Sequence, residues 1–177
     1  MNIKKISIGK DAPNQVNVII EVPMNSSDPV KYEMDKDSGA LFVDRFVGTG
    51  MSYPFNYGFI PHTLSEDGDP CDVVLITPFP VDMGALITCR ALGVLKMEDE
   101  SGVDAKILAV PIKKICPLYA NIDKIEDIET LQLSQIKYFF EHYKGLELGK
   151  WVKVSGFDDI NAAKKEILSS LDRAKNG

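Results

Sequence analysis

Three aspartates stand within the six residues 67–72, which read Asp-Gly-Asp-Pro-Cys-Asp and lead directly into the apolar run 73–77. A continuous apolar run of this length predicts a strand that is buried on both faces. In an extended backbone Asp67 and Asp69 point to one face, and the intervening glycine and proline supply a bend that can bring Asp72 round to it. Converging carboxylates repel one another, so without a cation at least one of them would have to bind a proton.

A second acidic group follows at Asp99, Glu100 and Asp104, around a Ser-Gly turn that would fold the first of these residues back beside the last. Neither group contains a histidine, and Cys71 is expected to point away from the face that the first two aspartates share. Ligands that are all oxygen favour a hard divalent ion, so we expect Mg²⁺, with Mn²⁺ as a substitute, in preference to zinc. The simpler alternative is that these carboxylates are solvated turn residues, although three aspartates in six positions are more than a turn needs.

Short β-rich runs dominate the first two thirds of the chain, and helical periodicity replaces them in the last third. Strands are expected at residues 16–22, 41–46, 73–77, 85–97 (bent around Gly93), 106–110 and 151–157. Helices are expected at residues 127–143, closed by Gly145, and after an N-cap at Asp158 or Asp159. Their buried stripes are predicted to be Ile128, Leu131, Ile136, Phe139, Phe140 and Tyr143, and then Ala163, Ile167, Leu168, Leu171 and Ala174. This pattern predicts an α+β fold, in which helices pack outside a compact antiparallel barrel.

The composition fits a single domain over residues 1–177 and excludes several classes of protein. The 26 acidic residues outnumber the 20 basic ones, and a net charge of −6 argues against a general nucleic-acid-binding protein. Three widely spaced cysteines without a C-x-x-C pair make disulfides or a zinc knuckle improbable and favour a reducing, cytoplasmic setting. No run approaches the ~20 apolar residues of a membrane span, and no signal peptide is visible, so no membrane association is expected.

Basic and phenolic side chains gather in four places. These are Lys31, Arg45, the pair Tyr53 and Tyr57, and the pair Tyr143 and Lys144. Ammonium, guanidinium and phenol groups are the donors that phosphate oxygens require, although each of these groups alone is a weak signal. No G-x-x-x-x-G-K-[ST] loop is present, so nucleotide hydrolysis on such a loop is not supported.

In order and spacing, these stretches resemble the soluble family I inorganic pyrophosphatases, especially the short bacterial type. The matching segments are residues 31–33, 39–45, 53–58, 67–73, 96–100, 104–106 and 139–144, within a span from Glu21 to Trp151. One departure is Cys71, where the family usually has an aliphatic residue. Residues after about 157 match less distinctively and indicate nothing about the site.

The resemblance implies hydrolysis of pyrophosphate to two orthophosphates by in-line attack of a metal-activated water, with Asp69 as the general base. The implied metal ligands are Asp67, Asp72, Asp104 and Asp99, with Glu100 nearby and Glu33 as an outer, mostly water-mediated contact. The implied phosphate-binding residues are Lys31, Arg45, Tyr57, Lys106, Tyr143 and Lys144. Glu21 and Tyr53 match positions that line the site.

The same resemblance implies several Mg²⁺ ions per subunit and a five-stranded, closed, OB-like barrel with flanking helices, mainly C-terminal. It also implies a homo-oligomer, usually a hexamer in bacteria. Two alternatives remain open from the sequence. One is a nucleic-acid-binding barrel that stacks bases on Tyr53, Phe55, Tyr57 and Phe59, and the other is a metal-binding structural subunit without activity.

Overall fold

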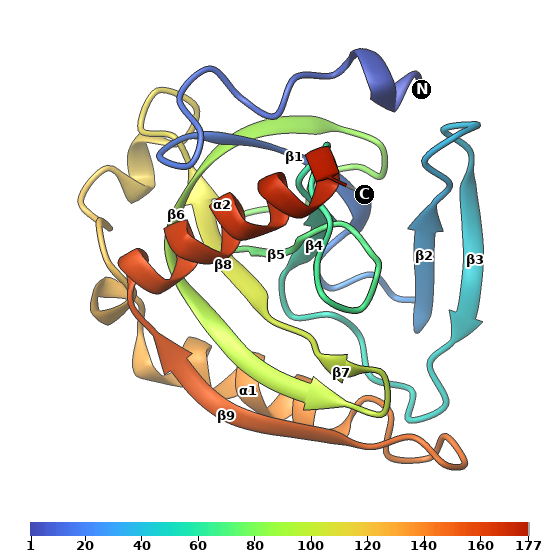
Figure 1. Cartoon of the computed structure of the whole chain (residues 1–177). Coiled ribbons are helices and arrows are strands. Elements are labelled where there is room, and N and C mark those ends of the chain that lie inside the picture. The colour runs from blue at the N-terminus through green and yellow to red at the C-terminus, as the bar shows by residue number, and fades with distance from the viewer. Residues whose placement is uncertain (177) are drawn as a thin grey trace.

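Five strands close into a ring in this computed structural model, which describes residues 1–176 (Figure 1). In order around the ring they are β1 (Val16–Val22), β4 (Asn56–Phe59), β5 (Asp72–Leu75), β8 (Lys106–Pro111) and β6 (Leu86–Asp99). The pairing of β6 with β1 completes the ring. The mixed sheet and its two α-helices confirm the α+β class, and the ring is consistent with the predicted five-stranded barrel.

The ring departs from the predicted antiparallel arrangement at one pair. Strands β5 and β8 run parallel, whereas the other neighbours in the ring are antiparallel. The reason is the connection between them: β6 and the short β7 (Gly102–Val103) form an antiparallel excursion that returns the chain to the same edge. A parallel pair needs such a crossover.

Strand β6 is the longest strand and also pairs with β9 (Val152–Asp158) beyond the ring. Its register against β8 shifts between Ala91 and Gly93, which confirms the predicted bend around Gly93. A Cβ atom at Gly93 would lie 2.5 Å from the carbonyl oxygen of Asp158, so the close approach of the backbone at the end of β9 requires glycine there.

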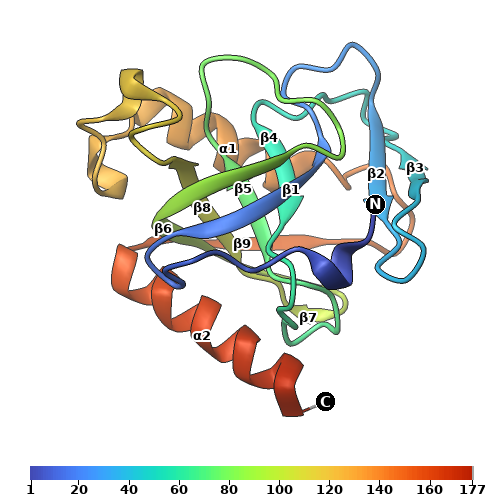
Figure 2. The same cartoon turned by 90° about the horizontal axis from the view of Figure 1, so that it is seen from above.

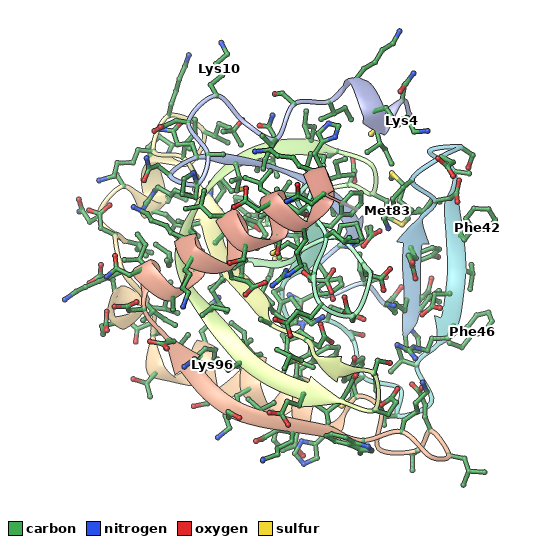
Figure 3. The ribbon with its side chains drawn as sticks, in the orientation of Figure 1. Lys4, Lys10, Phe42, Phe46, Met83 and Lys96 are labelled. Atoms are coloured by element: carbon green, nitrogen blue, oxygen red, sulfur yellow. The ribbon has the colours of Figure 1, made fainter. Side chains whose placement is uncertain are left out.

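Strands β2 (Val30–Met34) and β3 (Leu41–Phe46) form a separate two-stranded ribbon beside the ring (Figure 1). Figure 3 shows the side chains of Phe42 and Phe46 on β3 pointing away from the rest of the molecule. Their exposed fractions are 55% and 75%. The ribbon therefore has an apolar outer face and an inner face that can carry polar groups toward the ring.

Two helices lie outside the ring: α1 (Thr130–His142) packs against β9, and α2 (Ile160–Asn176) packs against β6. Helix α1 begins later than predicted because Ile125–Asp127 forms a separate 3-10 turn; others lie at Ile3–Lys5 and Pro117–Tyr119. It ends at His142, with Tyr143 as its C-cap, so the predicted closure at Gly145 is wrong. Asp159 caps α2 as predicted, because its Oδ1 accepts the backbone N–H groups of residues 161 and 162.

The buried stripes are narrower than predicted. Leu131 is 71% exposed on α1, and Leu168 and Ala174 are exposed on α2. Helix α2 buries Ala163, Ile167 and Ser170, at the i, i+4 and i+7 positions of a single face. Leucines at the margin of these buried faces remain in solvent.

The aromatic core excludes the base-stacking alternative. The side chains of Tyr53, Phe55, Tyr57 and Phe59 are each 5% exposed or less, and the first three pack against Phe139 and Phe140 of α1. Rings buried in this way cannot stack on nucleobases.

All three cysteines are buried and carry free thiols. Among residues 1–176, no helix has the length and the apolar content that crossing a bilayer would demand.

Candidate active site

A cavity of about 260 Å³ gathers the predicted site residues at the edge of the ring, between the ribbon and the segment after α1. Except for Glu21, it is lined by the complete predicted set: Lys31, Glu33, Arg45, Tyr53, Tyr57, Asp67, Asp69, Asp72, Asp99, Glu100, Asp104, Lys106, Tyr143 and Lys144. Residues up to 113 positions apart in sequence therefore meet in one place. The lining contains eight carboxylates and five cationic side chains, an excess of three negative charges.

The parallel pairing of β5 and β8 creates the centre of this cavity. Asp72 and Lys106 are the first residues of their strands and are direct register partners. The Nζ atom of Lys106 lies 2.5 Å from Oδ2 of Asp72 and also donates to Oδ1 of Asp104. The Tyr57 hydroxyl donates to the same Oδ2 atom of Asp72 at 2.5 Å. The topology thus forces a buried cation and two carboxylates together.

Burial and charge compete at Lys106, which is 3% exposed. Desolvation favours the neutral amine, yet Asp72 and Asp104 outweigh it and hold the pKa of Lys106 well above its usual range. For Asp104 the balance is reversed. Burial, together with the charge on Asp72, raises its pKa even though Lys106 is adjacent. The three groups are mutually dependent, and the loss of one leaves the others without compensation.

The turn between β6 and β7 builds the second half of the cavity. It pairs Asp99 with Gly102, which confirms that this turn folds Asp99 back toward Asp104. The Nζ atom of Lys144 reaches Oδ2 of Asp99 at 2.6 Å and Oε1 of Glu100 at 3.4 Å. Burial alone would raise the pKa of Glu100, but its hydrogen bonds with Lys150 and with backbone N–H groups, together with the charge of Lys144, outweigh burial and lower that pKa to about 2.

The inner face of the ribbon supplies the third side. Lys31 lies 3.1 Å from Asp44 and 3.6 Å from Glu33, so Lys31 and Glu33 point to the same side of β2. Arg45 lies 3.4 Å from Asp44 and 3.1 Å from Glu147. Strict alternation would turn Asp44 away from Arg45, but the register shifts between residues 31 and 32. This bulge makes Asp44 an additional residue on β3 and brings it to the cavity.

Asp67 and Asp69 occupy the loop that precedes β5. Burial is the main reason that the pKa of each lies above its ordinary value of 3.8. For Asp69 the neighbouring charges of Glu33 and Asp72 add to this effect. A raised pKa brings a carboxylate closer to the range in which it can accept and release a proton.

Tyr53 and Glu21, the two residues predicted to line the site, lie in different pockets. Tyr53 lines the cavity and packs its ring 4.5 Å from that of Phe139. Glu21 instead lies in a smaller adjoining pocket that it shares with Lys31, Glu33, Asp69 and Asp72, among others. Its Oε1 atom accepts the Met34 N–H at 2.8 Å, and burial raises its pKa to about 7. Glu21 thus ties the ribbon to β1.

The donor set fits hard divalent cations in its chemistry, because the acidic side chains offer only oxygen atoms. Within residues 1–176, no three His, Cys, Asp or Glu side chains stand close enough together to form a ready metal cluster. Lys106 separates Asp72 from Asp104, and Lys144 pairs with Asp99. The ammonium groups therefore occupy the positions from which cations would neutralise these carboxylates.

Four further residues line the cavity without having been predicted as site residues. These are Asp44, Ser101, Phe140 and Lys150. Phe140 was predicted as part of the buried stripe of the helix, and it also lines the cavity. Asp44 reaches the cavity because of the bulge in β3, and Lys150 reaches it because of the path of the chain after α1. Neither has a periodic signal that could have identified it.

Comparison with known proteins agrees with this geometry. Residues 18–175 match the family description "Inorganic pyrophosphatase". The chain is 57% identical to an inorganic pyrophosphatase of Ralstonia nicotianae and 55% identical to that of Escherichia coli, in each case over 99% of both chains. A solved inorganic pyrophosphatase from Coxiella burnetii superposes with a TM-score of 0.91 at 54% identity, covering 95% of this chain and 99% of that one. The resemblance is confirmed, and the chain belongs to the inorganic pyrophosphatase family.

Proposed function

We propose that this chain hydrolyses inorganic pyrophosphate to two orthophosphates with the help of divalent cations, Mg²⁺ in the first instance. The observation that carries the proposal is the cavity that combines eight carboxylates with five cationic side chains. A highly charged phosphate anion would be repelled by the net negative lining unless cations neutralised it. The cationic and phenolic groups then hold the anion, and this combination supports a metal-dependent phosphoanhydride hydrolase.

The proposed metal ligands are Asp67, Asp72 and Asp104 on one side and Asp99, with Glu100, on the other. Glu33 is proposed as an outer contact. When bound, the ions would lower the pKa of an attacking water toward neutrality. The chain's own carboxylates fix where positive charge can collect, and the buried Tyr57 hydroxyl orients Asp72 through its hydrogen bond.

The proposed phosphate-binding groups are Lys31, Arg45, Tyr57, Lys106, Tyr143 and Lys144. Each of these cations already pairs with a carboxylate of the cavity or its rim. A phosphate oxygen can replace such a carboxylate oxygen with little change of geometry. Lys106 and Lys144, each 6% exposed or less, are largely desolvated, so their hydrogen bonds to developing negative charge gain strength.

Asp69 is proposed as the general base, which takes a proton from the attacking water when it is ionised. Because burial raises the pKa of Asp69 above its ordinary value, activity should climb as pH rises through this raised pKa. We expect Asp69→Asn to remove this rise and to lower kcat by roughly 10²-fold or more, the scale of general base catalysis. Mg²⁺ affinity should change little. A pH–rate profile of the variant that matches the parent profile in shape and height would remove Asp69 from this role.

The direct test of the function is phosphate release from pyrophosphate, measured with Mg²⁺, with a chelator and with ATP as the competing substrate. We expect rapid release that requires the metal and strongly prefers pyrophosphate over ATP. Release of phosphate from neither substrate, with Mg²⁺ present and the protein folded, would refute the proposal and leave the structural-subunit alternative.

The proposal extends to the whole chain. We infer one domain over residues 1–177 on an OB-like barrel, a cytoplasmic location, no nucleic-acid or membrane partner, and assembly as a homo-oligomer, with six chains as the expected number. Exposed apolar side chains support assembly, among them Phe46 at 75% and Leu131 at 71% exposure. Light scattering that gave the mass of a single chain would contradict this part.

A further inference from the structure

The loop at residues 60–71 carries Asp67 and Asp69 and connects β4 to β5. Its tip is held by local bonds, from Ser65 N to the Asp69 carbonyl at 2.6 Å and from Asp69 N to Oδ1 of Asp67 at 3.0 Å. Gly68 allows the tip by adopting a φ of +94°. These bonds fix the shape of the tip, but they do not fix where the tip lies relative to the ring.

The C-terminal half of α2 anchors the part of the loop next to the tip, and the contact of His62 with the Ile6 carbonyl holds the loop at a second place. The Leu64 N–H donates to the carbonyl of Ser170 at 2.9 Å, and the Leu64 carbonyl accepts from Nη1 of Arg173 at 3.0 Å. Both backbone polar groups of one loop residue are therefore satisfied by the helix. Figure 2 shows the C-terminal end of α2 close to this loop. Leu64 stands three residues before Asp67, so the contact of α2 with Leu64 lies close in sequence to this carboxylate.

Arg173 is itself held in place by carboxylates of the loop and of α2. Its guanidinium lies 3.4 Å from Glu66 of the same loop and 3.5 Å from Glu166 of α2. Glu166 in turn accepts from the hydroxyl of Ser170, which is fully buried. Arg173, Ser170 and Glu166 do not line the cavity. Their contacts can affect the site only through the position of the loop.

We propose that Arg173 is a positioning residue for metal binding, which holds the loop so that Asp67 and Asp69 face Asp72 and Asp104. This inference rests on the proposed function. A charged donor on a backbone carbonyl is among the stronger hydrogen bonds in proteins. Partners that orient the ligands of a metal commonly change its affinity by 10–100-fold when they are replaced. Helix α2, which lies where the sequence resembles the family least distinctively, thereby contributes to the site.

The test compares Arg173→Ala with Arg90→Ala by calorimetric titration of each folded protein with Mg²⁺. Arg90 is a matched control because it donates to the backbone carbonyls of Tyr119 and Ile122 and pairs with Asp123, away from the cavity. We expect the Kd for Mg²⁺ to rise about 10-fold in Arg173→Ala and to stay at the parent value in Arg90→Ala. At saturating Mg²⁺, the KM for pyrophosphate should remain close to the parent value in both.

A second variant keeps the proposal testable if Arg173→Ala folds poorly. Arg173→Lys retains one donor for the Leu64 carbonyl and should recover part of the affinity. Parent-like Mg²⁺ affinity in Arg173→Ala, or equal weakening in Arg90→Ala, would overturn the inference while leaving the proposed function intact. Absence of Mg²⁺ binding in the parent protein would instead overturn the proposed function, and this inference with it.

Discussion

Replacement of Asp72 by Asn is expected to weaken Mg²⁺ binding and to lower turnover of pyrophosphate by at least about 10²-fold, the scale on which one electrostatic partner of a transition state acts. Asp72 receives hydrogen bonds from Lys106 and Tyr57, each at 2.5 Å. Because it is the first residue of a buried strand, no neighbouring carboxylate can move into its place. The measurement is kcat over a range of Mg²⁺ concentrations, together with calorimetry.

The control for this variant is Asp123→Asn. Asp123 also pairs with two cations, Arg90 and Lys113, but it lies outside the cavity. We expect parent-like kcat and Mg²⁺ affinity in the control. If Asp72→Asn retained more than half of the parent turnover at all Mg²⁺ concentrations, Asp72 would not be a metal ligand.

The second large effect concerns stability. With a chelator present, Lys106→Met should lower the free energy of unfolding by roughly 3–5 kcal/mol, because it leaves the partly buried Asp72 and the buried Asp104 without their cation. Addition of Mg²⁺ should restore part of this loss, since the ions neutralise the same carboxylates. Denaturant unfolding in chelator and in Mg²⁺ measures both effects.

Lys96→Met provides the matched comparison. Lys96 pairs with Asp158 at 2.5 Å, but these side chains are 56% and 40% exposed. Figure 3 shows Lys96 on the outer surface. An exposed pair of this kind contributes about 0–1 kcal/mol, and its loss should not respond to Mg²⁺. Equal effects of the two substitutions would mean that the buried position of Lys106 carries no special electrostatic role.

Most strand positions and the acidic clusters could be predicted because each depends on local sequence, whereas the ring strand β4 (Asn56–Phe59) was not predicted. The Ser-Gly turn predicted that the chain folds back after Asp99, and the apolar run after Asp72 predicted a buried strand. The parallel pairing of β5 with β8 could not be predicted, because it depends on how β6 crosses over. That pairing is what places Lys106 beside Asp72.

Features that depend on tertiary contacts could not be predicted from the sequence. Asp44 reaches the cavity through a bulge that period-two alternation does not encode. Leu131 and Leu168 fit a helical stripe yet remain exposed, because the face that each helix buries is narrower than that stripe. The hydrogen bond from Arg173 to the Leu64 carbonyl joins residues 109 positions apart, and no sequence motif marks it.

The most direct test of the account is a calorimetric titration of the unmodified protein with Mg²⁺, repeated with Mn²⁺. The account predicts that each chain takes up more than one ion, because the cavity carries three more negative than positive side chains. Neither metal producing a binding signal, with the protein folded and at neutral pH, would contradict the claim that these carboxylates exist to hold cations.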